Sequence, residues 1–216
     1  MEHRMHSLAE QVFELIERDI LNGSYARGEI LTESQLCEQL QVSRTPVREA
    51  LGRLEQEHLL ENTPKGLVVT GLSPEDIADI YTLRDRIEGL AARRLAEQAT
   101  EEQIAELKET LDLQEFYLQR GDNENVKEMD SRFHRIIYRA CGSSIFRYIL
   151  DGVLMRIVKY RKASLTHAGR AYKSLDEHKA IFSAIAAHDG DAAEKSMRAH
   201  VNAAYEALHL SGEDNG

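Results

Sequence analysis

Four residues in the C-terminal two thirds of the chain have the types and spacing of metal ligands. Asp130 and His134 are four residues apart, so they share one face of a helix. His178 and His200 each lie among apolar residues at helical spacing, which directs polar groups from three helices into one interior. Burying a carboxylate and three imidazoles is costly, and a divalent transition metal would satisfy them together. We expect one such ion per chain, with zinc preferred over nickel, manganese or iron.

Each histidine also has a simpler interpretation, which is a core residue whose ring is satisfied by hydrogen bonds. For any one histidine alone this interpretation is the better one, whereas the joint pattern favours the metal. An octahedral ion held by one Asp and three His would keep two positions for water or for the oxygens of an organic acid. The metal would then be part of a sensor for a small carboxylate.

Two further side chains could complete a binding site for such an effector. Arg84 lies near the inner stripe of the first helix of the C-terminal region, and its fork could pair with a carboxylate. A salt bridge to Glu88, four residues later, is an equally good interpretation of Arg84. Tyr138 lies one turn beyond His134 and could line the same cavity, although aromatic residues in helical bundles more often serve packing.

A second set of residues, near the N-terminus, has the chemistry of DNA contacts. Arg44 and Arg48 stand on either side of Thr45 near the start of an amphipathic helix, and arginine suits phosphate oxygens and the O6/N7 edge of guanine. Lys65 and Gly66 lie at the tip of a short hairpin that would form a wing. The alternative, in which Arg44 and Arg48 only solvate a surface helix, is disfavoured because the caps, turn and hairpin are in register.

The sequence predicts capped helices that would hold Arg44 and Arg48 in place. Thr32 with Gln35 forms a capping box, and a similar box starts a helix near residue 7. The helix that carries the arginines is expected to have Thr45 as its N-cap and Pro46 in its first position. Residues 7–71 are therefore predicted to form a winged helix-turn-helix with three helices and a hairpin.

Beyond Gly71 the sequence has helical periodicity and no clear strand pattern. Ser73 is expected to cap a helix that Pro74 opens, and Thr100 with Gln103 forms another capping box. Helices are predicted at about 74–98, 101–119, 123–141, 144–162, 169–188 and 191–209. The fold class is mainly α, with an N-terminal winged helix-turn-helix followed by an all-helical antiparallel bundle.

Composition is that of a soluble globular protein. With 216 residues, 42% hydrophobic and 30% charged, the chain could hold one large or two small domains. We expect a DNA-binding domain at 1–72, an effector- and metal-binding domain at 73–210 and a disordered tail at 211–216. The chain shows no apolar run of membrane-spanning length and no signal peptide at its start, and its two cysteines fall in helical patterns, so a cytoplasmic location with no membrane partner is expected.

The net charge of −10 argues at first sight against nucleic acid. Residues 1–72 hold seven basic and twelve acidic residues, so the expected DNA-binding domain is itself acidic. Binding to phosphates needs local positive potential, which Arg44, Arg48, Arg53 and Lys65 would have to supply on one face. A homodimer on a palindromic operator would double these contacts.

The run VSRTPVREALGRLEQEHLL, from Val42 to Leu60, closely resembles the N-terminal domain of GntR-type bacterial transcription regulators. The resemblance implies DNA contacts from the arginines and threonine named above, with a wing after them. Two positions depart from the family pattern. Ser34 stands where some relatives have an arginine, and Arg27-Gly28 stands where Pro-Gly is usual. The departure at Ser34 puts one phosphate or base contact in doubt.

The C-terminal pattern resembles the FCD effector-binding domain of the FadR branch of these regulators. The resemblance rests on an AspxxxHis pair, a later histidine in the run EHKAI and a third histidine 22 residues after it. It implies a metal held by Asp130, His134, His178 and His200 beside a cavity for small carboxylates. The six predicted helices resemble the shorter VanR-like group.

These patterns predict a ligand-responsive transcription regulator that binds double-stranded DNA, rather than an enzyme. One alternative is a metal-dependent hydrolase fused to a nucleic-acid-binding module. That alternative has a metal site but no HExxH, SxxK, GxSxG or Walker motif in the sequence. A third possibility is a regulator that senses the metal itself.

Overall fold

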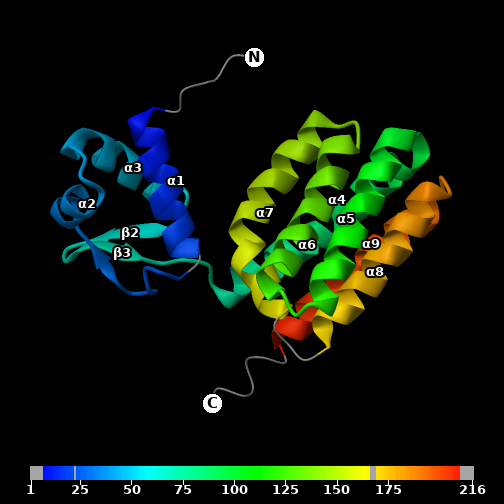
Figure 1. Cartoon of the computed structure of the whole chain (residues 1–216). Coiled ribbons are helices and arrows are strands. Elements are labelled where there is room, and N and C mark those ends of the chain that lie inside the picture. Colours follow the sequence, from blue (N-terminus) through cyan, green and yellow to red (C-terminus); the bar gives the residue numbers. More distant parts are fainter. Residues whose placement is uncertain (1–6, 22, 166–168, 210–216) are drawn as a thin grey trace. The chain divides into compact units, whose positions relative to one another are not determined.

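The computed structural model describes residues 7–21, 23–165 and 169–209, without the side chains of 154–156, 158–164 and 209. The chain falls into two compact units that divide after Ile77, and each is described here by itself (Figure 1). The boundary predicted between residues 72 and 73 lies a few residues ahead of this division. The tail predicted at 211–216 lies outside the described residues.

The N-terminal unit is a winged helix-turn-helix, as predicted. Its elements are α1 (Leu8–Leu21), β1 (Ile30–Leu31), α2 (Glu33–Leu40), α3 (Arg44–Gln56), β2 (Leu60–Thr63) and β3 (Gly66–Val69). Helices α1 and α2 both pack against α3. Apolar residues of all six elements form one core, in which Ile16, Val47 and Leu54 are fully buried. Burial of these side chains holds α3 in place and leaves its opposite face to solvent.

The wing is a three-stranded antiparallel sheet with the strand order β1-β3-β2. Thr63 pairs with Gly66 at its tip, and Ile30 pairs with Val68 on the other side. The strand β1 was not predicted, because two residues are too few to show a strand pattern. Gly66 has a φ of 126°, and a Cβ atom there would lie 3.0 Å from Cγ2 of Ile30. The wing therefore needs a glycine at this position.

The helix α3 begins earlier than predicted. Its N-cap is Ser43 rather than Thr45, so Pro46 occupies the third helical position instead of the first. This is tolerated because the first turn of a helix has no intrahelical partners for its N–H groups. The cap predicted for α2 is correct, since the Thr32 side chain accepts a hydrogen bond from the backbone N–H of Gln35.

The C-terminal unit is a helical bundle, as predicted. Its helices are α4 (Pro74–Gln98), α5 (Glu101–Gln119), α6 (Asn123–Ala140), α7 (Ser144–Ser164), α8 (Arg170–Ala186) and α9 (Gly190–His209). The observed ends agree with the predicted ranges to within two residues. Helix α5 packs against α6 and α8, and α9 packs against α7 and α8, so that segments far apart in sequence lie side by side (Figure 1).

Local capping accounts for the helix starts in this unit. Thr100 and Gln103 form both hydrogen bonds of a capping box at the start of α5. The Ser73 hydroxyl accepts a hydrogen bond from the backbone N–H of Asp76, which caps α4 ahead of Pro74. Among the described helices, none combines the length and the apolar character that crossing a membrane requires.

Candidate metal centre and DNA-binding surface

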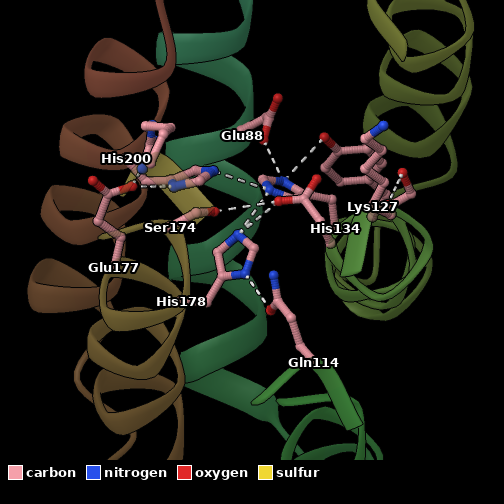
Figure 2. A network of polar contacts seen from close by, with 12 residues as sticks. Glu88, Gln114, Lys127, His134, Ser174, Glu177, His178 and His200 are labelled. Atoms are coloured by element: carbon pink, nitrogen blue, oxygen red, sulfur yellow. Dashed lines mark hydrogen bonds and ion pairs between the residues drawn. The ribbon is translucent and has the colours of Figure 1, made fainter. Parts of the chain in front are cut away.

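Three buried histidines from three helices meet in the interior of the bundle. His134 comes from α6, His178 from α8 and His200 from α9, and their candidate ligand atoms all lie within 4.8 Å of one another. The Nε2 atom of His134 lies 3.2 Å from Nε2 of His200 and 3.3 Å from Nε2 of His178. Figure 2 shows the three rings pointing toward one another. The sequence placed these histidines on apolar stripes, and the structure brings them together.

The spacing of these nitrogen atoms fits a metal ion. Two nitrogens that are each about 2.0–2.1 Å from one ion lie about 2.8–3.4 Å apart, with adjacent octahedral positions at the lower end and tetrahedral positions at the upper end. Both measured Nε2–Nε2 distances lie in this interval. The donor set and its spacing therefore match what a divalent transition metal requires.

The outer nitrogen of each ring faces an oxygen atom. Nδ1 of His134 lies 2.9 Å from Oε2 of Glu88, and Nδ1 of His200 lies 2.7 Å from Oε2 of Glu177. A carboxylate at Nδ1 selects the tautomer with its proton on Nδ1, which directs the lone pair of Nε2 toward the centre. Lone pairs that face one another repel, and a cation between them removes that repulsion. The ring orientations thus also fit a metal.

The third histidine is held in a different way. Nδ1 of His178 lies 3.0 Å from the amide oxygen Oε1 of Gln114, on α5. The ring of Phe133 stacks on the His178 ring, with centroids 4.3 Å apart and an interplanar angle of 21°. Contacts from two neighbouring helices therefore fix this imidazole as well.

Asp130, the fourth predicted ligand, lies beside His178, one of the three histidines. Its Oδ1 atom lies 3.6 Å from Nε2 of His178, and the hydroxyl of Ser174 donates a hydrogen bond of 3.4 Å to the same oxygen. Asp130 is 3% exposed, so its carboxylate stands inside the bundle. The Asp130 carboxylate is therefore a buried neighbour of His178, while the ligand atoms that all lie within 4.8 Å of one another belong to the three histidines.

Arg84, predicted as an effector contact, is buried in α4 beside this centre. Its Nε donates a hydrogen bond of 2.5 Å to Oε1 of Glu88, so the predicted salt bridge is present. Its Nη1 and Nη2 have no hydrogen-bond partner within the described part of the chain. Burial is the largest influence on the pKa of Arg84 and would lower it, but the attraction of Glu88, Tyr81 and Tyr138 and the hydrogen bond to Glu88 together outweigh it and raise the pKa, so the guanidinium stays charged. A buried cation with unused donors is a ready anchor for an anion.

Tyr138 also lies at the centre. Its hydroxyl is 3.5 Å from Nδ1 of His134, and the residue is 1% exposed. The hydroxyl could therefore contact a ligand that binds beside Arg84.

Sequence reasoning missed several residues of this centre. Glu88 entered only as a partner of Arg84, and Glu177, Gln114 and Arg170 were not considered. Arg170 is buried and donates a hydrogen bond of 2.8 Å from Nη2 to Oε2 of Glu177. Burial raises the pKa of the Glu177 carboxyl, and the attraction of Arg170 opposes that rise. The available signal was the position of Glu177 next to His178 in the run EHKAI.

The residues predicted to contact DNA lie on the surface of the N-terminal unit. Arg44, Thr45 and Arg48 are exposed in the first turns of α3, and Lys65 is exposed at the tip of the wing beside Gly66. An open hollow of about 400 Å³ separates the outer face of α3 from the wing and has Arg48 and Gly66 in its lining. The start of a helix and a hairpin on one surface have the arrangement that a winged helix uses on a major groove.

One of these arginines already has a carboxylate partner. Arg48 donates hydrogen bonds of 3.0 Å and 2.9 Å to the two carboxylate oxygens of Glu33, the first residue of α2. The Arg48 hydrogen bond lowers the pKa of the Glu33 carboxyl.

Arg53 is engaged elsewhere, contrary to its predicted place on the same cationic face. It forms an ion pair with Glu10 on α1, and its guanidinium lies 3.8 Å from the centroid of the Phe13 ring. The Arg53 side chain therefore contributes to the packing of α1 against α3.

Comparison with known proteins shows that both units of the chain match described families. Residues 8–68 match the family model "Bacterial regulatory proteins, gntR family", and residues 79–203 match the FCD domain. The chain is 28% identical over 207 residues to the HTH-type transcriptional repressor RspR of Escherichia coli, covering 95% of this chain and 91% of that protein. It is 29% identical over 183 residues to the gluconate operon transcriptional repressor of Bacillus licheniformis, covering 82% of this chain and 75% of that protein.

A solved structure has the same fold. The protein McbR/YncC of E. coli superposes with a TM-score of 0.77 at 23% sequence identity, over 96% of this chain and 99% of that one. At this identity the likeness supports the fold alone. The two family matches and the similar repressors bear on function.

Proposed function

The chain is a DNA-binding transcription regulator of the GntR family with a C-terminal FCD domain, and we propose that this domain senses a small carboxylate at a metal-assisted site. The observation that carries the proposal is the meeting of three buried histidines beside a buried arginine with two unused nitrogens. Imidazole clusters bind divalent transition metals, and arginine forks bind carboxylates.

The metal would be held by His134, His178 and His200, with Asp130 as the fourth protein ligand. When bound, it would supply positive charge and open positions for the oxygen atoms of an organic acid. Zinc is the first candidate for three imidazoles and one carboxylate, followed by nickel, manganese and iron.

The balance of charge at the centre supports an anionic effector. In the described part of the chain, the buried or half-buried charged groups that contact these histidines directly or through one partner include two arginines and three carboxylates, namely Arg84, Arg170, Glu88, Asp130 and Glu177. With all five ionised they leave one net negative charge, which a divalent metal would convert to one net positive charge. One carboxylate on a ligand would restore neutrality, and a low-dielectric interior favours neutrality.

Arg84 would bind that carboxylate through Nη1 and Nη2, with Tyr138 beside it. The pairing would give partners to two buried donors that have none among the described residues, and unpaired buried donors are costly. A relative whose name gives a gluconate operon as its target supports a small sugar acid as one candidate.

In the N-terminal unit, Arg44, Thr45 and Arg48 would enter the major groove, while Lys65 and Gly66 of the wing would approach the backbone of the duplex. Two copies of the chain would bind as a homodimer to the two half-sites of a palindromic operator. The effector would change operator occupancy only through its different affinity for the two conformations, and couplings of this kind are about 1–3 kcal/mol.

The test of this function is a calorimetric titration of the zinc-loaded protein with gluconate, lactate, succinate and citrate as probes. We expect at least one probe to bind, and Arg84→Met to weaken that binding by about tenfold to a hundredfold, because hydrogen bonds to charged groups contribute about 1.5–3 kcal/mol. Arg86→Met is the matched control, since Arg86 is an exposed arginine two residues away on the same helix.

Zinc content is measured on each variant, so that loss of metal is separated from loss of the anchor. Failure of all four probes to bind the zinc-loaded wild type would contradict the carboxylate assignment. Equal binding by the wild type and Arg84→Met would remove Arg84 from the site. Chemical conversion of a bound probe would favour an enzyme over a regulator.

A further inference from the structure

The three histidines differ in the group that holds the outer side of the ring. A carboxylate faces Nδ1 of His134 and of His200, provided by Glu88 and Glu177. In Figure 2 the two carboxylates stand on the outer sides of these two rings. A carboxylate at Nδ1 draws the proton toward itself and makes Nε2 a stronger donor to a metal.

Each carboxylate is in turn held by a buried arginine. Arg84 donates to Oε1 of Glu88 at 2.5 Å, and Arg170 donates to Oε2 of Glu177 at 2.8 Å. The chain therefore contains two Arg–Glu–His relays. One runs from α4 to α6 and consists of Arg84, Glu88 and His134; the other runs from α8 to α9 and consists of Arg170, Glu177 and His200. The arginine in each relay holds the glutamate in place with a charge-assisted hydrogen bond, and another contact of the glutamate is its histidine.

The outer nitrogen of the third histidine faces an amide instead of a carboxylate. Nδ1 of His178 faces the neutral amide of Gln114, whose Nε2 atom has no hydrogen-bond partner within the described part of the chain. An amide oxygen accepts the same hydrogen bond but carries no net charge. The His178 ring is therefore oriented like the other two, yet its Nε2 atom gains less electron density.

We propose that Glu88 and Glu177 are positioning residues that make His134 and His200 the strong metal donors, and that Gln114 leaves His178 as the weak, exchangeable donor. This inference rests on the proposed metal site and adds a ranking of its ligands. Asp130 and Ser174 lie next to His178, so the weak position is also the one with oxygen atoms nearby. A sensor gains from one weak ligand, because an incoming oxygen donor can displace it without release of the metal.

The test measures the affinity for Zn²⁺ alone, by competition with a chromophoric chelator. Glu177→Gln keeps the shape and the hydrogen-bond acceptor but removes the charge, and we expect it to lower the affinity about tenfold to a hundredfold. Gln114→Glu makes the reverse change and should raise the affinity by a similar factor. If these side chains served only packing or orientation, Gln114→Glu would not raise the affinity for Zn²⁺.

Two comparisons complete the design. Glu115→Gln is the control for net charge, because Glu115 neighbours Gln114 in sequence but pairs with Lys179 at the surface. We expect its affinity to match the wild type within about twofold. His178→Ala should lose about tenfold less affinity than His134→Ala, since it removes the weaker donor. If Gln114→Glu fails to fold, Glu177→Gln and the two alanine variants still test the ranking.

The outcomes separate the ranking from the proposed function. A wild-type protein that binds no zinc would overturn both. Zinc binding with unchanged affinity in Glu177→Gln, or equal losses in His178→Ala and His134→Ala, would overturn the ranking and leave the metal site in place.

Discussion

At the scale of single residues, Arg48 shows how a side chain that is expected to bind DNA is held before DNA is present. Its guanidinium spans both oxygens of Glu33, and the Arg48 side chain is exposed while that of Glu33 is partly exposed. Exposed ion pairs contribute little to stability, so phosphate or guanine can replace Glu33 at small cost. The ion pair orients the guanidinium of Arg48 but is weak enough for the guanidinium to exchange Glu33 for DNA.

This arrangement predicts a specific effect of Arg48→Ala. We expect operator affinity to fall about tenfold or more and sequence preference to relax, because the arginine fork would be lost from the recognition helix. The measurement is a fluorescence anisotropy titration against operator and random duplexes at two salt concentrations. Arg18→Ala is the control, since Arg18 is an exposed arginine on α1 of the same unit. Equal losses in both variants would mean that only net charge matters and would contradict the role of Arg48.

The residues of the helical centre divide into those that a pattern can reveal and those that it cannot. His134, His178 and His200 were visible because polar residues on apolar helical stripes are unusual. Glu177 was not, because its role depends on how α8 packs against α9. Glu88 serves Arg84 and His134 at once, and that dual contact exists only in the folded bundle.

At the scale of elements, helix ends were predictable wherever a capping residue and its partner are adjacent in sequence. Thr100 with Gln103 is the clearest case. The start of α3 was predicted wrongly, because Ser43 and Thr45 are both good caps and local sequence does not rank them. Strand β1 was missed because its pairing with β3, rather than its own two residues, makes it a strand.

The capping box at α5 gives a stability prediction. Thr100→Ala removes the side-chain acceptor for the backbone N–H of Gln103, and we expect the helical unit to lose about 1 kcal/mol of unfolding free energy. Urea denaturation followed by circular dichroism measures the change. Thr82→Ala is the matched control, because that hydroxyl only donates back to the carbonyl of Ala78 inside α4. The capping argument would fail if both variants unfolded at the same urea concentration.

At the scale of the whole molecule, an acidic chain contains two units with different tasks. The net charge of −10 does not argue against DNA binding, because the cations that we propose to contact DNA are local to α3 and the wing. The sequence patterns sufficed for the fold class because the winged helix-turn-helix and the bundle both follow from local periodicity and caps. The effector and the operator are not readable in this way, since they depend on the shape of assembled surfaces.

A metal at the proposed site would stabilise the helical unit. The candidate ligands come from α6, α8 and α9, so a bound ion would join helices that are far apart in sequence. A ligand that binds only the folded state stabilises it in proportion to the logarithm of its concentration relative to Kd. The metal would therefore be both a structural tie and a part of the sensor.

The most direct test of the central claim is elemental analysis of untagged protein that is purified without added metal. We expect about one divalent transition metal ion per chain in the wild type and none in His134→Ala. His188→Ala, which changes a histidine at the end of α8 whose Nδ1 faces the backbone carbonyl of Ala96, should keep the ion. A wild-type protein without metal, or a His134→Ala variant that retains a full equivalent, would contradict the account.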